Sequence, residues 1–182
     1  MALKATIFKA ALQVADIERG YYADHALTIA RHPSETDERM MVRVLAFALH
    51  AGEGLAFAGG LSDEDAPDLW ERDLTGAIRT WIEVGLPDEK QVRRACGRAD
   101  RVFVYSYGRG ADRWWAEVGD KLARSENLTV VDLPLATTRE LAALAKRNMA
   151  LSCTIQDGQV LVSDGAATVQ MDLAYTQRPT VS

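Results

Sequence analysis

The sequence predicts an α/β domain built on a mixed sheet, and three observations lead to this class. The chain has 182 residues, which suits one domain of ordinary size. Its two terminal parts alternate apolar and polar residues as half-buried strands do. Its middle part instead holds short apolar runs that alternate with helical patterns, as in sheets covered by helices. We expect one domain over residues 1–176 and a loose tail over residues 177–182.

The N-terminal part predicts a β-hairpin followed by a helix. Residues 5–14 and 21–30 alternate on either side of a short polar segment that ends in Gly20, which is typical of two strands and a turn. Ser34 follows Pro33, and acidic residues fill the next turn, so we expect a helix that begins at Ser34 and ends near His50. The apolar stripe of this helix comprises Met41, Val42, Leu45 and Leu49.

The rest of the chain gives further elements in order. Thr75-Gly76 separates two apolar runs and predicts a two-residue hairpin turn. Pro87 opens a short helix, because a proline at the first helical position has no N–H to leave unbonded. Turns at Asp157-Gly158 and Asp164-Gly165 divide the C-terminal strands. The expected strands cover residues 68–74, 77–84, 101–107, 128–133 and parts of 152–175, and the expected helices cover residues 112–124 and 138–148.

Composition and charge exclude several classes of protein. With 48% hydrophobic and 26% charged residues, the chain is neither disordered nor fibrous. A net charge of −5 rules out a uniformly basic coat for nucleic acid. No run of 18 apolar residues predicts a membrane span, and no signal peptide is expected. Two distant cysteines, Cys96 and Cys153, are expected to be buried, so we predict a cytoplasmic protein without structural zinc.

The charges are nevertheless unevenly distributed along the chain. Residues 53–89 carry a net charge of −8, and residues 90–124 carry +5. This separation allows a face that attracts metal beside a face that attracts phosphate, and it equally fits solvated surfaces that happen to cluster.

Two carboxylates form the central candidate site. If the strands close across Thr75-Gly76, Asp68 faces Glu83 and Trp70 faces Trp81, and directly opposed residues project to one face of the sheet. Opposed like charges destabilise a sheet. A divalent cation between the two carboxylates would remove that penalty, so we expect Asp68 and Glu83 to share a metal ion.

A third carboxylate is expected from the N-terminal helix. Glu38 shares the stripe of Met41 and Leu45, and Glu35 lies one turn earlier on a similar side. Either one is a candidate outer ligand of the metal. The alternative is that both simply stabilise the helix N-terminus electrostatically.

These residues carry a resemblance to a known superfamily and to one family within it. Pro-Asp on one strand, a hairpin and Ile-Glu-x on the next strand resemble the PD-(D/E)XK nuclease superfamily. Longer runs, spread over nearly the whole chain, are similar to the YaeQ family of bacterial proteins. The runs are residues 32–43 (HPSETDERMMVR), 67–70 (PDLW), 73–76 (DLTG), 88–90 (DEK), 95–102 (ACGRADRV) and 153–160 (CTIQDGQV).

The resemblance implies a restriction-endonuclease-like core, in which helices flank a mixed sheet, with additional N-terminal and C-terminal β-strands. Asp68 matches the first metal-binding aspartate of the superfamily, and Glu83 matches its second acidic residue. The third signature position, normally lysine, is Gly85. Lys90, in the first turn of the next helix, is the candidate that replaces this lysine and acts on water or phosphate. The alternative is an ordinary exposed lysine.

The leading hypothesis is a Mg²⁺- or Mn²⁺-dependent nuclease with Asp68, Glu83 and Lys90 in the catalytic site. The rival is a catalytically inactive protein that binds nucleic acid or another protein, because Gly85 stands where lysine belongs. A third reading has Arg72 and Arg79 hold the two carboxylates. The candidates for phosphate contacts, which are equally consistent with solvated surfaces, are Arg93, Arg94, Arg98 and Arg109.

Overall fold

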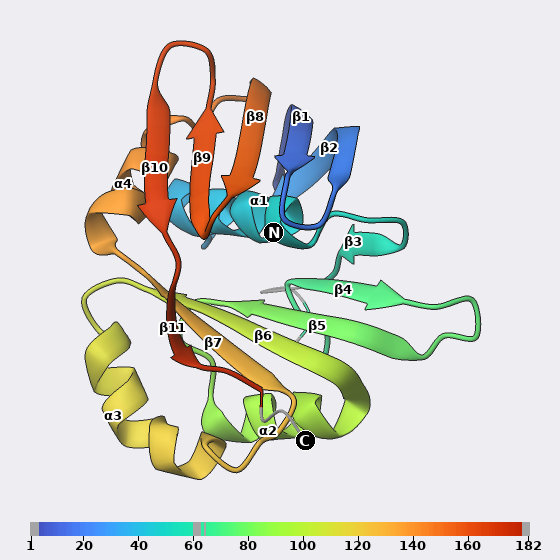
Figure 1. Cartoon of the computed structure of the whole chain (residues 1–182), viewed down its shortest axis with the longest axis vertical. Coiled ribbons are helices and arrows are strands. Elements are labelled where there is room, and N and C mark those ends of the chain that lie inside the picture. Colours follow the sequence, from blue (N-terminus) through green and yellow to red (C-terminus); the bar gives the residue numbers. More distant parts are fainter. Residues whose placement is uncertain (1–3, 60–62, 64, 180–182) are drawn as a thin grey trace. The chain divides into compact units, whose positions relative to one another are not determined.

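The computed structural model describes residues 4–59, 63 and 65–179. The chain forms two compact units. The first unit contains residues 1–51 and 136–173, and the second contains residues 52–135 and 174–182. Each unit holds one sheet together with its own helices (Figure 1). The coarse prediction of a mixed α/β fold is confirmed, whereas the prediction of one domain over residues 1–176 stays a prediction.

The first unit is built on a five-stranded sheet in the order β10-β9-β8-β1-β2. The predicted N-terminal hairpin is confirmed as an antiparallel pair, and β8 runs parallel to β1. The strands alternate buried and exposed residues, because one face packs on a helical core and the other faces solvent. The elements are β1 (Thr6–Asp16), β2 (Tyr21–Arg31), α1 (Asp37–His50), α4 (Leu135–Ala143), β8 (Asn148–Gln156), β9 (Gln159–Ser163) and β10 (Thr168–Asp172).

Helix α1 begins later than its sequence predicts. Thr36, and not Ser34, caps the helix, because its hydroxyl accepts a hydrogen bond from the backbone N of Arg39 (3.1 Å). The Ser34 hydroxyl is instead bonded to the His32 ring at 2.6 Å. The helix is also more deeply buried than one apolar stripe predicts, since every residue from Met40 to Ala48 is buried, Arg43 included.

The second unit holds a six-stranded sheet in the order β11-β7-β6-β5-β4-β3. Strands β5, β6 and β7 run parallel, β4 and β11 pair antiparallel to this group, and β3 pairs antiparallel to β4. Trp81 of β5, Val92 of α2 and Trp114 of α3 belong to the core that joins the two helices to the sheet. The elements are β3 (Leu55–Phe57), β4 (Leu69–Arg72), β5 (Ile78–Val84), α2 (Glu89–Arg98), β6 (Ala99–Tyr107), α3 (Ala111–Leu122), β7 (Leu128–Leu133) and β11 (Ala174–Gln177).

The predicted bounds of the last helix were wrong. Helix α4 begins at Leu135, directly after Pro134, and Asn148 already belongs to strand β8 instead of the last helix. Strand β11 includes Gln177, the first residue of the predicted tail, and residues 180–182 lie outside the described residues. The turns at Asp157-Gly158 and Asp164-Gly165 are confirmed, and both glycines have positive φ.

The β4–β5 hairpin has a longer turn than predicted, yet the predicted pairing holds. Asp73 N donates to Ala77 O (2.9 Å) and Gly76 N donates to Asp73 O (3.0 Å), so three residues form the loop. This loop shifts the register by one residue. A bulge between Glu71 and Arg72 shifts it back, so that Trp70 pairs with Trp81 as the sequence predicts.

Candidate functional site

Asp68 and Glu83, the two central candidates, are both buried in the second unit. Asp68 directly precedes β4 and is 1% exposed, and Glu83 lies in β5 and is 5% exposed. Asp68 bonds to both chain neighbours of Glu83: its backbone N donates to Ile82 O (3.0 Å), and its Oδ2 accepts from Val84 N (2.8 Å). The backbone therefore holds Asp68 beside Glu83. That both side chains project to one face of the sheet stays a prediction.

Glu83 is held by two donors that sequence reasoning missed. Its Oε1 accepts hydrogen bonds from Trp81 Nε1 (2.8 Å) and from Gln91 Nε2 of α2 (3.0 Å). Trp81 lies two residues earlier on β5 and so projects to the same face, a spacing that could have indicated the contact. Nothing in the sequence indicated the contact of Gln91 with Glu83, because most amide side chains on a helix are solvated. Both donors fix the orientation of a buried carboxylate.

Gly85, which the resemblance places at the signature lysine position, has a backbone conformation that disfavours any side chain. Its φ is +100°, and its backbone N donates to Tyr105 O (2.9 Å). A Cβ at Gly85 would meet no atom within 4 Å, so the obstacle to a lysine is backbone strain and not space. The local backbone therefore favours glycine at position 85.

Replacing Gly85 with alanine is expected to lower the free energy of unfolding by about 1–2 kcal/mol, the cost of a left-handed conformation for a residue with a Cβ. The control is Gly97→Ala, because Gly97 lies in α2 and its Cβ would also meet no atom within 4 Å. That variant should gain up to about 1 kcal/mol. Urea denaturation measures both changes. Equal changes in the free energy of unfolding for the two variants would show that alanine at position 85 is not strained.

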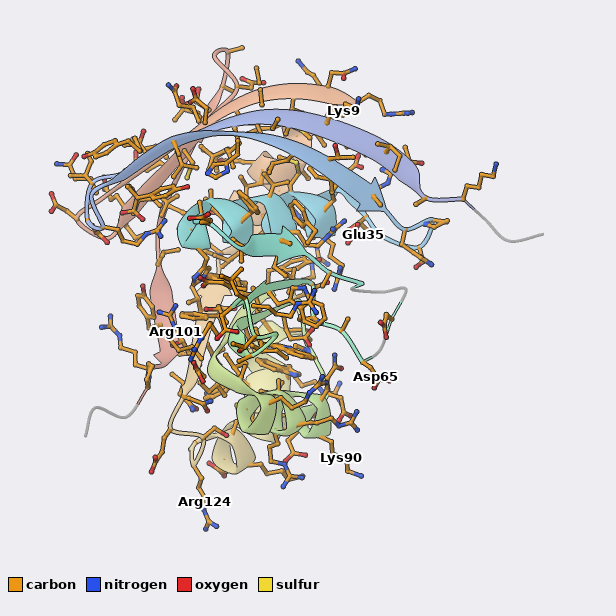
Figure 2. All side chains as sticks on the ribbon, turned by 90° about the vertical axis from the view of Figure 1, so that its right-hand side faces the viewer. Lys9, Glu35, Asp65, Lys90, Arg101 and Arg124 are labelled. Carbon is orange, nitrogen blue, oxygen red and sulfur yellow. The ribbon has the colours of Figure 1, made fainter. Side chains whose placement is uncertain are left out.

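Lys90, the third catalytic candidate, lies in the first turn of α2 and is exposed. Its backbone N donates to Oδ1 of Asp88, which caps the helix (2.8 Å). Figure 2 shows the Lys90 side chain directed away from the ribbon of α2. Among the described residues the ammonium makes no ion pair. This geometry favours the exposed-lysine alternative, and a role on water or phosphate stays a prediction.

Glu35 and Glu38 belong to the first unit, so their joint role with Asp68 and Glu83 stays a prediction. Glu35 is buried and both of its oxygens bind arginine: Oε1 pairs with Arg43 Nη2 (2.5 Å), and Oε2 accepts from Arg39 Nη1 (2.7 Å) and Arg43 Nε (3.0 Å). Glu38 Oε2 accepts from Thr138 Oγ1 (3.1 Å). These contacts indicate that Glu35 neutralises a buried arginine, a role that the sequence did not suggest.

The predicted phosphate-binding arginines are partly gathered on one helix. Arg93, Arg94 and Arg98 lie on α2, and Arg109 is exposed in the loop that precedes α3. Arg93 pairs with Glu89 (2.6 Å), and Arg94 lies 3.6 Å from Asp65. The Arg94 pair is exposed on both sides and therefore weak, whereas the Glu89 partner of Arg93 is largely buried. Arg98 stacks over the ring of Trp81 (5.1 Å).

The third reading, in which Arg72 and Arg79 hold the two carboxylates, was wrong. Arg72 stacks over the ring of Trp70 at 4.3 Å. Arg79 pairs with Asp73 (2.7 Å) and with Asp100 (2.8 Å). Both arginines therefore stabilise the hairpin at other positions than the candidate site.

A further carboxylate, also missed from the sequence, lies on β7. Asp132 Oδ1 accepts a hydrogen bond from Ser106 Oγ of β6 (3.0 Å). Burial raises the pKa of Asp132 above its usual range, the Ser106 bond opposes this, and the nearby charge of Asp112 adds to it. An aspartate within the mostly apolar run of residues 128–133 was the sequence feature that could have indicated this carboxylate.

The donor set fits a hard divalent cation. Carboxylate oxygens are the preferred ligands of Mg²⁺ and Mn²⁺, and Mg²⁺ is commonly held by only one or two carboxylates together with water and substrate phosphates. Asp68 and Glu83 supply two such groups. Within the described ranges no group of three or more His, Cys, Asp or Glu side chains has the arrangement of a metal site.

The two cysteines are expected to react at different rates. Burial raises the pKa of Cys153 to about 12 and also raises the pKa of the half-buried Cys96, so both are thiols at neutral pH. Labelling with dithionitrobenzoate at pH 8 should modify Cys96 first and Cys153 only when the protein unfolds. A Cys96→Ser variant isolates Cys153, and fast labelling of that variant would contradict the burial.

The fold and the site together define a general class of protein. The chain is a mixed α/β protein with two sheets and a buried pair of carboxylates, one directly before β4 and one on β5. No helix in the described part is long and apolar enough to cross a membrane.

The chain belongs to the YaeQ family. The model of this family, described as YaeQ protein, matches residues 1–173. It is 46% identical to YaeQ of Salmonella typhi and 43% identical to YaeQ of Escherichia coli K12, in each case over 98% of this chain and 99% of the relative. The crystal structure of YaeQ from Xanthomonas axonopodis pv. citri is similar with a TM-score of 0.92 and 46% identity, over 96% of this chain and 99% of that one. The structure from Pseudomonas syringae matches with a TM-score of 0.92 and 36% identity, over 96% and 97%.

Proposed function

We propose that this chain is a divalent-metal-dependent nuclease of PD-(D/E)XK type, with Asp68 and Glu83 as the ligands of Mg²⁺ or Mn²⁺. The observation that carries the proposal is a pair of buried carboxylates, Asp68 directly before β4 and Glu83 on the adjacent strand β5, each held by hydrogen-bond donors. Carboxylate oxygens are the ligands that hard divalent cations prefer, and backbone contacts hold Asp68 beside Glu83. A restriction-endonuclease-like core is part of the same proposal.

The residues around the site divide the chemistry among them. When bound, the metal ion lowers the pKa of its water and stabilises negative charge on the phosphate. Trp81 and Gln91 hold Glu83 in one orientation, and Val84 N holds Asp68. The arginines of α2 supply positive charge for the phosphate backbone. Lys90 is assigned to a phosphate or to the attacking water, because Gly85 supplies no cation.

The proposal is tested by incubating the purified chain with Mn²⁺ or Mg²⁺ and labelled single-stranded and double-stranded DNA and RNA. Cleavage is expected with at least one substrate, and chelation of the metal should abolish it. A Glu83→Gln preparation, purified in parallel, controls for contaminating nucleases. Cleavage that persists unchanged in Glu83→Gln would contradict the proposal.

The second candidate function is a binding protein that has kept the core and lost turnover. The positive φ of Gly85 favours this second candidate, because a lysine at that position would be strained. This candidate predicts a gel shift with nucleic acid, or capture of a protein partner, without cleavage under any metal condition. The same substrates therefore separate the two functions.

A further inference from the structure

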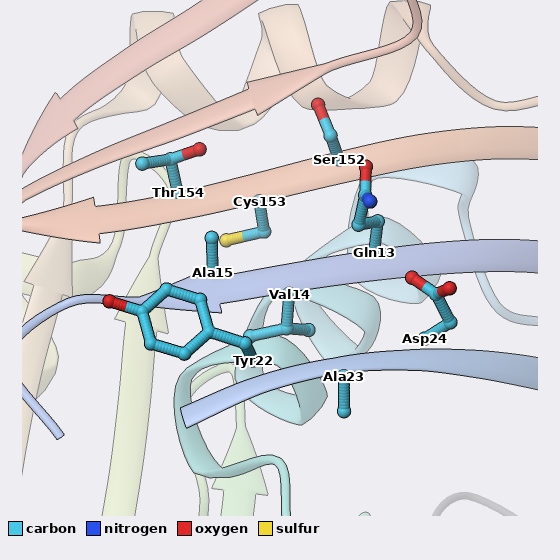
Figure 3. Close-up of a pocket in the computed structure, with 9 residues that line it drawn as sticks. All are labelled: Gln13, Val14, Ala15, Tyr22, Ala23, Asp24, Ser152, Cys153 and Thr154. Atoms are coloured by element: carbon cyan, nitrogen blue, oxygen red, sulfur yellow. The ribbon is translucent and has the colours of Figure 1, made fainter. Parts of the chain in front are cut away.

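The solvent face of the sheet in the first unit contains a hollow that the proposed function does not use. Two adjoining cavities, of about 300 and 490 Å³, lie over strands β2, β1 and β8, and both are lined by Gln13, Asp24 and Ser152 (Figure 3). All of these residues lie in the first unit, whereas Asp68 and Glu83 lie in the second. The hollow is therefore a separate site.

The strand register explains why this face is hollow. Asp24, Gln13 and Ser152 are register partners across the three strands and form a polar row. In the neighbouring row Ala15 pairs with Tyr22 on one side and with Thr154 on the other. A small alanine between larger side chains leaves space beside the Tyr22 ring, as Figure 3 shows.

The chemistry of the lining narrows the class of ligand. Tyr22 is 64% exposed on this face, so its ring is accessible to a ligand that stacks on it. The carboxylates among the lining residues described are Asp24 and Asp164, and Asp164 is already bonded to the backbone N of Ala166 and Ala167. The one histidine among them, His25, is bonded through its ring to the Tyr21 hydroxyl (2.9 Å). A phosphate or another anion would be repelled, so this is not a second nucleic-acid site.

The polar groups also argue against a purely cationic ligand. A cation uses acceptors only, whereas the Gln13 amide and the hydroxyls of Ser152 and Thr154 both donate and accept hydrogen bonds. In the described part of the chain, these three side chains have no hydrogen-bond partner of their own. A neutral ligand rich in hydroxyl groups matches donors and acceptors together, and its flat apolar face matches an aromatic ring.

We propose that this hollow binds carbohydrate, with the Tyr22 ring stacked on one sugar and the row of Asp24, Gln13 and Ser152 bonded to its hydroxyl groups. The open, shallow shape predicts weak binding of a linear oligosaccharide that lies along the sheet, because a shallow hollow leaves most of a ligand exposed to water. No covalent step is involved. The proposal does not depend on nuclease activity.

The test is a titration of the ¹⁵N-labelled full chain with cellohexaose, maltohexaose and chitohexaose, up to about 10 mM each, followed by amide chemical shifts. At least one sugar should give saturable shifts confined to β1, β2 and β8. Tyr22→Ala should weaken this binding at least about tenfold, and Tyr22→Phe, which keeps the ring, should preserve it. Tyr175→Ala is the matched control, because Tyr175 is 45% exposed on β11 of the second unit.

Three results would overturn the proposal. One is the absence of saturable shifts with all three sugars. Another is binding that Tyr22→Ala leaves unchanged while its spectrum shows a folded protein. The third is saturation of the same face by spermidine but by none of the sugars, which would identify a cation site instead.

Discussion

Asp68→Asn is expected to lower metal-dependent cleavage on the order of 10³-fold, the largest effect on activity of any single change. A metal ion contributes several kcal/mol to the stabilisation of a phosphoryl transition state, and each 1.36 kcal/mol is a tenfold change in rate. Asparagine keeps the size of the side chain and an oxygen that accepts from Val84 N, so the local fold should survive. The measurement is the single-turnover rate on the best substrate with saturating Mn²⁺.

Two controls make that result specific. Glu117→Gln removes an exposed carboxylate of the same unit, which pairs with Arg113 on the surface of α3, and should leave the rate unchanged. Thermal unfolding of Asp68→Asn in metal-free buffer should stay close to that of the wild type. A rate within about threefold of wild type in Asp68→Asn would remove Asp68 from the catalytic site.

Arg43→Met is expected to lower the free energy of unfolding by about 3 kcal/mol, the largest effect on stability. Arg43 is buried on α1, where it pairs with both oxygens of Glu35 and donates to Ala30 O of β2 (3.1 Å). Removing one partner of a buried pair leaves the other charge uncompensated in a medium of low dielectric constant. Arg39 still contacts Glu35, which keeps the loss at the lower end of the usual range. Urea denaturation measures the change.

The matched control is Arg113→Met, which breaks an ion pair exposed on both sides and should change the free energy of unfolding by less than about 1 kcal/mol. The double variant Glu35→Leu with Arg43→Met should recover much of the loss, because it removes both buried charges. If Arg43→Met and Arg113→Met have equal effects, Arg43 does not carry a buried ion pair.

The sequence predicted the site pairing for a reason that was only partly right. Trp70 faces Trp81 as expected, although the turn holds three residues instead of two. The extra turn residue and the bulge beside Arg72 have opposite effects on the register, and neither has a strong sequence signature. Side-chain packing at the site still requires this pairing, because a shift by one residue would turn the tryptophans to the other face of the sheet.

The parts that sequence reasoning missed depend on contacts between residues distant along the chain. Gln91 reaches Glu83 from α2, and Arg43 is buried against Glu35 from the middle of α1. A polar residue on a helix is predicted to be solvated by default, and only tertiary packing overrides this. The prediction of the α1 cap was wrong for a local reason. Ser34 and Thr36 are both good caps by residue type, but the Ser34 hydroxyl is hydrogen-bonded to the His32 ring.

Calorimetric titration of the chain with Mn²⁺, in parallel with the double variant Asp68→Asn and Glu83→Gln, tests the central claim most directly. The account predicts saturable binding of Mn²⁺ below about 1 mM in the wild type and at least about a tenfold loss of affinity in the variant. Binding that is equal in both proteins, or no saturable binding in the wild type, would contradict the assignment of Asp68 and Glu83 as metal ligands.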